Sequence, residues 1–533
     1  MKTSKIIFSL LFFLCSTAVF GQNGDPVFRD KITTAVLNVY DEHLAQNPGD
    51  YNVLFARANQ HYYDGDYKSA MADVNKALQL TPKKDKELRF DEYILRARIS
   101  DACQDYKAEL ADLKLAREIQ PKSLACIDFI AKANLKAGNI DEAEKAFKTI
   151  LNSESMNFDA MYGMAQVQQS RGNLTAALEQ VNKAVSYFPN EPQVYVNRAD
   201  IFTRQGNISA ALQDLLTGMN AGNGGNAAQR LFELSDTHYG EVMATLANLA
   251  GMSNDSGLYH YLRASIAMDH SRYGQALKDL SIIKRNNLYN SHLVDYNLAK
   301  CYLELGRIDE ALDQVERAMA ISPNQPEYFL VKSLAQYYAG EGGHVNEAMS
   351  TLDRCTAIAP EYMPMLLAKG ELIAAQERDK DALGYLNAAV AHDPGDAEAR
   401  LARALTLKRM GYDQLLAEDM RVLNMLSDDV ENMRGVALIE QGRDEEAQAW
   451  LDKVTATAMP GGANFINAAR LMVMRGDNAK ALEYVQKAID NGYGSKYTLL
   501  IDELTPFNLK PLRELPEFKA LIERAQGNFV ESD

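Results

Sequence analysis

Three glycines spaced 34 residues apart, Gly138, Gly172 and Gly206, constrain the fold of this chain more than any other feature. A fixed period of this length is typical of proteins built from repeated units, each of which buries its apolar face against its neighbours. Because glycine readily adopts the left-handed conformation that closes a helix, we interpret these positions as turns. The register extends to twelve positions, nine of them Gly: Gly65, Gln104, Gly138, Gly172, Gly206, Ser271, Gly306, Gly340, Glu377, Gly411, Gly442 and Gly476.

Small residues lie at matching distances on both sides of these turns. Seven residues before the turn, all twelve units carry Ala, Gly or Ser. Five residues after it, ten of the twelve carry Ala, once a three-residue insertion after Gly340 is allowed. Small side chains on both arms let two antiparallel helices approach closely, and in six units Pro follows seventeen residues after the turn, where it stops the second helix. The pattern predicts an all-α chain of about twelve helix hairpins.

This pattern resembles that of the tetratricopeptide repeat family over about residues 49–220 and 257–490. The likeness is carried by stretches such as Gly65-Asp66-Tyr67 with Ala70 and Lys76-Ala77-Leu78, and Leu305-Gly306-Arg307 with Glu310-Ala311-Leu312. The resemblance implies a right-handed superhelix of hairpins, an α-solenoid, whose inner groove binds peptides or segments of other proteins.

The stretches outside the two repeat blocks complete the predicted domain organisation. The order is a leader (1–21), a capping helix (22–48), about five repeats (49–220), a divergent helix pair (221–256), about seven repeats (257–490) and a C-terminal cap with its tail (491–533). Terminal caps cover the apolar faces that stacking leaves open. The divergent pair is either a degenerate repeat in a continuous array, which we favour, or a joint between two superhelical blocks.

Oppositely charged residues recur at equal distances from the turns. Six units carry Arg eight residues before the turn, and five of these six carry Asp eight residues after it. Equal offsets lie at similar heights on antiparallel helices, and Arg suits a partly buried carboxylate better than Lys. We therefore predict structural ion pairs 16 residues apart: Arg57–Asp73, Arg96–Asp112, Arg198–Asp214, Arg263–Asp279 and Arg403–Asp419. The alternative interpretation is a ladder of arginines that binds a ligand.

The resemblance also implies where a partner binds, because the first helix of each hairpin lines the inner face in this family. Aromatic anchors dominate the energetics of protein binding, so tyrosines at outward-facing positions of that helix are candidates. The predicted groove residues are Phe55, Tyr62, Tyr63, Arg98, Tyr162, Tyr261, Tyr296, Tyr337 and Tyr338. The alternative is that tyrosine is ordinary at these positions and takes no part in binding.

No catalytic motif accompanies the repeats. The sequence has neither a GxxxxGK phosphate loop nor an HExxH zinc motif, and its eight histidines are scattered. We therefore expect no enzyme activity, no cofactor and no metal site. A net charge of −16 disfavours nucleic acid as a partner and leaves other proteins. A protein-interaction scaffold or adaptor is the favoured function, a module for a small ligand or glycan is the alternative, and self-association is left open.

The first 21 residues predict export. Lys2 and Lys5 precede an apolar run from Ile6 to Val19, and Gly21 ends a small-residue junction of the kind that signal peptidases cleave. The leader resembles those of Gram-negative bacteria of the Bacteroidetes type, which implies the periplasm, with envelope components as partners and association with the outer membrane left open. No later run is long enough to span a membrane. An oxidising compartment permits disulfides, although buried thiols are the favoured interpretation for Cys103, Cys126, Cys301 and Cys355.

Overall fold

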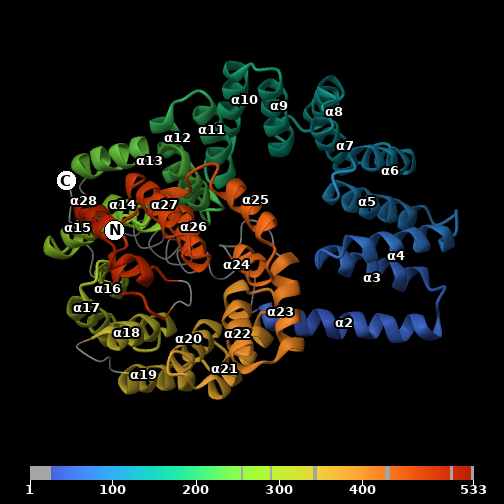
Figure 1. The fold of residues 1–533 in the computed structure, drawn as a ribbon. Helices are drawn as coiled ribbons and strands as arrows, with labels where there is room; N and C mark the ends of the chain where they lie inside the picture. Colours follow the sequence, from blue (N-terminus) through green and yellow to red (C-terminus); the bar gives the residue numbers. More distant parts are fainter. Residues whose placement is uncertain are drawn as a thin grey trace. The chain divides into compact units, whose positions relative to one another are not determined.

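The chain is built of helices throughout the part that the structure describes (Figure 1). This structure is a computed structural model, and it describes residues 26–253, 256–288, 291–339, 345–425, 433–504 and 508–529. Within these ranges there is no strand, and consecutive helices pack as antiparallel pairs, which confirms the predicted all-α solenoid of hairpins. The predicted leader, residues 1–21, and the turn at Gly340 lie outside the described residues.

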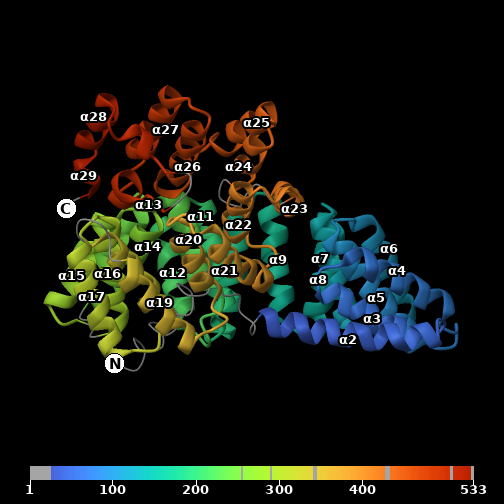
Figure 2. The same ribbon diagram turned by 60° about the horizontal axis from the view of Figure 1, so that its bottom comes forward.

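Two units divide the chain, Met1–Leu234 and Ser235–Asp533. In the first, the helix α2 (Pro26–Gln46) lies along the first hairpin, as Figure 2 shows. Five hairpins follow: α3 (Tyr51–Tyr63) with α4 (Tyr67–Leu80), α5 (Lys86–Ala102) with α6 (Tyr106–Ile119), α7 (Leu124–Lys136) with α8 (Ile140–Ser153), α9 (Phe158–Ser170) with α10 (Leu174–Tyr187), and α11 (Pro192–Arg204) with α12 (Ile208–Asn220).

Among the residues that the structure describes, the second unit contains seven hairpins. They are α14 (Ser256–Asp269) with α15 (Tyr273–Arg285), α16 (His292–Glu304) with α17 (Ile308–Ile321), α18 (Pro326–Tyr338) with α19 (Val345–Ile358), α20 (Met363–Ala374) with α21 (Asp379–His392), α22 (Ala397–Met410) with α23 (Asp413–Met425), α24 (Met433–Glu440) with α25 (Asp444–Val454), and α26 (Ala463–Met474) with α27 (Asn478–Asp490). The helical turns η1 (Pro460–Gly462), η2 (Tyr497–Ile501) and η3 (Lys510–Leu512) and the helices α28 (Pro516–Arg524) and α29 (Gln526–Phe529) complete it.

The predicted divergent pair, residues 221–256, holds one element, α13 (Ala227–Met252), which contains residues of both units. At His238 the backbone leaves the helical region, with φ −131° and ψ 38°, so α13 consists of two helical segments joined by a kink. The boundary between the units falls at Leu234, inside this element.

The turns follow the predicted register at all eleven described positions. Eight of them are glycines with φ between 70° and 80°. The other three, Gln104, Ser271 and Glu377, take the same left-handed conformation at φ 59°, 53° and 59°. This conformation costs a residue with a Cβ roughly 1–2 kcal/mol. The position in the repeat therefore determines the backbone conformation, and Gln104, Ser271 and Glu377 adopt it in spite of this cost.

The residue after each turn begins the second helix in two different ways. In the first unit it is Asp or Asn, and in four of the five hairpins the side chain caps the helix, as Asp66 does by accepting a hydrogen bond from the Ser69 amide at 3.0 Å. In the second unit this residue is Arg at four positions. Arg443, for example, donates to Glu446 in the first turn of α25 at 2.8 Å. Both arrangements place an acceptor where the helix has free N–H groups.

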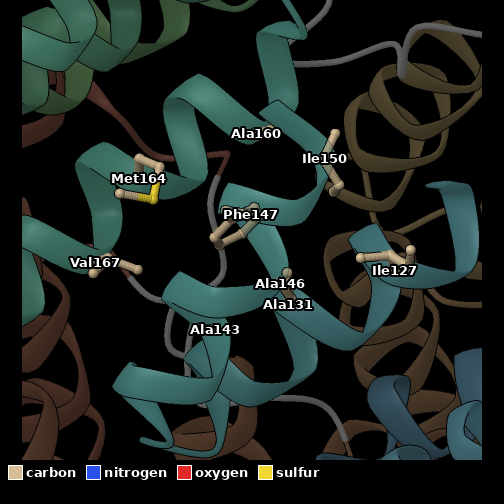
Figure 3. Close-up of a cluster of buried hydrophobic side chains, with 9 residues drawn as sticks. All are labelled: Ile127, Ala131, Ala143, Ala146, Phe147, Ile150, Ala160, Met164 and Val167. Atoms are coloured by element: carbon tan, nitrogen blue, oxygen red, sulfur yellow. The ribbon is translucent and has the colours of Figure 1, made fainter. Parts of the chain in front are cut away.

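Large side chains of the second helix fill space that small residues of a first helix leave open. Figure 3 shows this in the cluster formed by α7, α8 and α9, which contains Ile127, Ala131, Ala143, Ala146, Phe147, Ile150, Ala160, Met164 and Val167. A Cβ on Gly163 would lie 2.2 Å from the Phe147 ring, and one on Gly370 would lie 2.5 Å from Leu386. Packing therefore explains the small residues of the repeat without reference to ligands.

Each stack curves so that the first helices line its inner face. The first helices of neighbouring hairpins contact each other, as α3 does with α5, α7 with α9, and α16 with α18. Among the described helices, no pair of second helices makes an equally extensive contact. Because elements on the inside of a curve lie closer together, the inner face is formed by the first helices.

Candidate functional site

The inner face of the first unit carries an aromatic pair beneath a guanidinium group. Tyr62 and Tyr63 end α3, with ring centroids 5.6 Å apart at an angle of 70°. Arg98 of the next first helix lies over both rings, at 4.6 Å from the Tyr62 centroid and 5.8 Å from that of Tyr63. Tyr63 is 60% exposed. The structure thus brings together three of the predicted groove residues from two successive hairpins, and we call them the Tyr–Arg cluster.

Charged side chains of both signs continue along this inner face. Lys136 of α7 donates to Asp101 of α5 at 2.6 Å. Lys132 forms ion pairs with Asp128 at 2.7 Å and with Asp159 of α9 at 3.4 Å. These lysines are more than 40% exposed, so salt screens the pairs and water competes with them. A partner can exchange these weak contacts for its own at little cost.

The two remaining candidates in the first unit are less accessible. Phe55 is half-buried and packs against the core clusters around Leu54 and Ala58. Tyr162 is half-buried against the cluster of Ala165, Ala177, Val181 and Ile201, and burial is the main cause that raises the pKa of its hydroxyl. Both residues stabilise the hairpins, and only part of each side chain is accessible to a partner.

One carboxyl group of the first unit occupies a position that is Ala in most repeats. Glu109 lies five residues after the turn at Gln104, is 5% exposed, and has an oxygen, Oε2, without a hydrogen-bond partner. Burial, together with the negative charge of Asp101, raises the pKa of Glu109 to about 7. Lys136 on the same inner face partly offsets this rise.

In the second unit the structure corrects the predicted role of Tyr261. Tyr261 is only 2% exposed, and its hydroxyl accepts a hydrogen bond from Asn297 at 3.1 Å. The ring fills the space between α14 and α16, so a partner cannot reach it. Tyr296 is half-buried and lies against Tyr328, with centroids 4.7 Å apart, which gives it a packing role as well.

The predicted role of Tyr337 and Tyr338 in the groove is also wrong, because residues near the C-terminus of the same chain pack against them. The Tyr338 hydroxyl accepts hydrogen bonds from the backbone N–H groups of Glu503 and Leu504, at 3.1 and 3.3 Å. The ring of Tyr497 meets that of Tyr338 edge-on, with centroids 5.3 Å apart. Tyr337 packs in the same cluster as Leu504. The repeat register holds no information about these contacts, because they come from residues outside the repeats.

The five predicted Arg–Asp pairs are brought together in every case. Both oxygens of Asp73, Asp112, Asp214 and Asp419 accept from their arginines, with donor–acceptor distances between 2.5 and 2.8 Å. The remaining pair, Arg263 with Asp279, is a single contact at 3.0 Å, and His260 lies 2.7 Å from the same oxygen. All five carboxylates are at most 6% exposed, a location that suits hairpin staples better than a ligand-binding ladder.

The same basic residues have a second partner that the sequence analysis missed. The arginine reaches back to the second helix of the preceding hairpin, or to α2 in the first one: Arg57 to Asp41, Arg96 to Asn75, Arg198 to Asn182 and Arg403 to Asn387. Two units with Lys at this position follow the rule, with Lys332 bound to Glu316 and Lys369 to Asp353. Five of the six spacings are 16 residues. A search for polar residues 16 before the basic one would have found them.

One group of side chains in the second unit is able to hold a cation. Ligand atoms of Asp236, Asp269 and His270 all lie within 4.8 Å of one another. His270 is 3% exposed, and its Nε2 is 3.2 Å from the Ser235 hydroxyl. Burial, followed by the positive charge of Arg272, lowers the pKa of His270 to about 4. The nearby guanidinium disfavours a cation, and the expectation of no metal and no catalysis stays a prediction.

The four cysteines of the described chain are free thiols. Cys126, Cys301 and Cys355 are fully buried, and Cys355 packs against Leu352 and Met365 at a position filled by Ala in related units. Cys103 is exposed. Packing thus accounts for three of the four. Among the described helices none is long and apolar enough to cross a bilayer.

Comparison with known proteins gives the same result as the internal register. Tetratricopeptide repeat family models match residues 134–201, 261–326 and 432–453. All three matches lie within the predicted repeat blocks. No curated protein sequence matches the chain.

Solved structures resemble the chain only distantly. The Naa15/Naa10 complex bound to HypK-THB is 11% identical, with 99% of this chain and 96% of that chain covered and a TM-score of 0.34. The Cut9–Hcn1 hetero-tetramer of the APC/C is 14% identical, covering 92% and 99%, with a TM-score of 0.32. A tetratricopeptide repeat protein from Parabacteroides merdae is 15% identical, covering 46% and 99%, with a TM-score of 0.25. These values are too low to transfer any property to this chain.

Proposed function

Because this chain is a tetratricopeptide repeat protein, we propose that it is a scaffold that binds segments of other proteins along the inner face of its first unit. The observation that carries the proposal is the Tyr–Arg cluster, formed by Tyr62, Tyr63 and Arg98. Tyr and Arg are the side chains that most often dominate binding energies. Tyr63 is exposed here, whereas Tyr62 also packs against the core cluster around Ala58 and presents only part of its ring. The neighbouring charges of both signs would fix the orientation of a partner rather than attract one sign of charge.

The first unit is favoured over the second because its inner tyrosines are accessible. Tyr63 is 60% exposed, whereas Tyr338 is bound by the backbone of residues 503 and 504. A partner at the Tyr–Arg cluster needs to displace only side-chain contacts of the inner face itself. It would gain the stacking and cation–π energy of three large side chains, each worth about 1–2 kcal/mol when desolvated.

We further propose that the protein works in the cell envelope of a Gram-negative bacterium, after export to the periplasm. The support is the sequence of residues 1–21, with its charged start, apolar run and small-residue junction. A cell fractionation in which the full chain remains in the cytosol would contradict this location, and the mature protein is expected to begin at Gln22.

The test of the binding role is crosslinking in cells that make the tagged chain, followed by purification and mass spectrometry of the envelope fraction. We expect a small set of partner proteins with the natural chain, and their loss with the double variant Tyr62→Ala/Tyr63→Ala. Removal of two anchors of about 2 kcal/mol each lowers affinity by several hundred-fold or more.

Tyr187→Ala is the matched control, because Tyr187 is 49% exposed but ends a second helix, α10. This variant should retain the partners and melt as the natural chain does. The double variant also loses the core contacts of Tyr62, so its melting curve must show that it is still folded at the temperature of the experiment. Recovery of the same partners with all three proteins would contradict the inner-face proposal. Purification of the chain without any protein would instead favour the alternative, a module for a small ligand or glycan.

A further inference from the structure

The inner face of the second unit is occupied by the chain's own C-terminal residues. Residues Ser495–Leu504 lie on the first helices α16 and α18, where Figure 1 shows the red end of the chain beside these helices. Ser495, Leu499 and Asp502 are at most 1% exposed. These ten residues are separated from α16 and α18 by about 160 to 190 positions in the sequence. We call them the closing segment.

Polar contacts hold the closing segment at both of its ends. At the first end, the Ser495 hydroxyl donates to Glu304 Oε2 at 2.5 Å, at the last position of α16. At the other end, the Tyr338 hydroxyl accepts from the amides of Glu503 and Leu504. Glu304 and Tyr338 occupy the same position of their repeats, two residues before the turn. Two successive repeats thus recognise the segment with equivalent positions.

Apolar contacts fill the space between these two ends. Tyr497 packs edge-on against Tyr338 and joins the cluster around Leu303 and Val331. Leu504 packs in the next cluster, with Phe329 and Leu352. The Ile501 side chain lies so close to Gly306 that a Cβ on this glycine would be 2.8 Å from it. The arrangement matches the way a partner segment binds a repeat groove, with aromatic and aliphatic anchors between hydrogen-bonded ends.

The residues before the closing segment fix where it starts. The Gly494 amide donates to the Ser271 carbonyl at 2.9 Å, and Arg272 donates to the Asn491 carbonyl at 3.1 Å. Ser271 and Arg272 form the turn of the first hairpin of this unit, and Asn491 follows its last hairpin. These contacts tether the segment, so its effective concentration at α16 and α18 is high whenever it detaches.

Like charges oppose this closure. Asp502 brings its carboxylate near Glu304 and Glu371, and it raises the pKa of both groups beyond the effect of burial. Arg470 compensates in part, since its Nη2 lies 3.3 Å from Asp502 Oδ2. The positive charge of Lys300 also compensates in part, because it lowers the pKa of Glu304. A segment that served only to fill the core would not carry an acid into an acidic surface, because an apolar residue avoids this cost.

From these contacts we infer that the inner face of the second unit is a segment-binding surface, held closed by residues 495–504, which opens to a partner protein when the closing segment detaches. The inference rests on the proposed binding role and extends it to a second, regulated site. The partner that this surface fits is read from the segment that fills it. It is a stretch of about ten residues with a hydroxyl side chain, a tyrosine two residues later and an apolar turn, without the acid that Asp502 brings toward Glu304 and Glu371.

The test uses a fluorescent peptide with the sequence of residues 494–504 and the full chain. Fluorescence anisotropy should show weak binding to the natural chain, because the tethered segment competes. The variant Tyr497→Ala loses the central anchor of the tethered segment and should bind the peptide at least about tenfold more tightly. Addition of Tyr338→Phe to this variant removes the acceptor for two amides and should reduce peptide binding about tenfold. A peptide with Ala in place of Tyr497 is the control and should not bind.

Hydrogen exchange gives a second measurement on the same proteins, including the natural chain. We expect the amides of Glu503 and Leu504 to exchange faster than those of α16 and α18, through local detachment. Exchange of these amides only with global unfolding would overturn the inference. So would a Tyr497→Ala chain whose segment exchanges freely but which binds no peptide. Neither readout involves Tyr62 or Tyr63, so a failure here is distinct from a failure of the first-unit proposal.

Discussion

The carboxylates that join the two helices of a hairpin stabilise the folded chain more than ion pairs on the surface do. Asp214 accepts two hydrogen bonds from Arg198, and its side chain is 8% exposed. Arg198 also donates to Asn182 of the preceding hairpin at 2.9 Å, so one guanidinium connects three helices. If one of these hydrogen-bond acceptors is removed, the positive charge of the guanidinium group loses a partner that water cannot fully replace, and the folded state is destabilised.

We expect Asp214→Ala to lower the free energy of unfolding by about 2 kcal/mol, since it leaves the half-buried Arg198 without its main acceptor. Urea denaturation followed by circular dichroism measures this change. The control is Glu142→Ala, which removes a pair with Lys145 whose side chains are 61% and 70% exposed. Water and salt screen this exposed pair, so its loss should change the free energy of unfolding little. Equal effects of the two substitutions would show that the hairpin pairs are not staples.

Glu371 should make the second unit less stable as the pH rises. Burial, with Glu398 and Asp502 adding to it, raises the pKa of Glu371 to about 8, whereas in the unfolded chain the group titrates near 4.5. Between these values the folded chain retains a proton that the unfolded chain has released, so stability falls from about pH 4.5 through about pH 8. We expect Glu371→Gln to reduce the fall of the melting temperature between about pH 6 and about pH 9. The exposed Glu517→Gln serves as control, and an unchanged slope with Glu371→Gln would contradict this assignment.

At the scale of the elements, the turns determine how the hairpins close. Gln104 holds φ 59° where most repeats have Gly, so Gln104→Gly should stabilise the chain by about 1 kcal/mol. The matched control is Gly138→Ala, which places a residue with a Cβ at a turn that now has glycine and should therefore destabilise the chain. Gly138 has φ 80°, and a Cβ added there would meet no atom within 4 Å, so its cost of about 1 kcal/mol is purely conformational. Thermal melts of both variants check this, and shifts in the same direction would be evidence against the turn register.

The hairpins and their staples were predictable from the sequence because each is encoded within one repeat. Arg198 and Asp214 are 16 residues apart across a turn of known position, so local geometry suffices to pair them. The contact from Arg198 to Asn182 needs the packing of one hairpin on the next. Arg96 to Asn75 spans 21 residues instead of 16, mainly because α5 has 17 residues where α11 has 13. Contacts between repeats thus vary with the lengths of the elements that separate them, and a fixed register misses them.

The groove was predicted less well, for two physical reasons. An outward-facing position was assigned to Tyr261 from the register alone, yet its neighbours bury it to 2% exposure. Tyr338 does face inward, but residues of the closing segment bind it, and no repeat pattern connects positions 338 and 503. Exposure depends on contacts between distant parts of the chain, whereas the register describes one repeat at a time.

At the scale of the whole molecule, the two units have the same architecture and different inner faces. In the first, an exposed Tyr–Arg cluster and weak charge pairs leave the inner face available to a partner. In the second, the closing segment covers the corresponding helices α16 and α18. On this account the first unit presents an open inner face, and the inner face of the second unit becomes available only when the closing segment detaches.

Site-specific photocrosslinking in living cells tests the central claim, that the inner face of the first unit binds protein partners. A photoreactive amino acid is placed at Tyr63 in one chain and at Tyr187 in another, two exposed tyrosines on a first and a second helix. We expect discrete covalent adducts with partner proteins from position 63, and none of these from position 187. Adducts of the same proteins at both positions, or at 187 alone, would contradict the account.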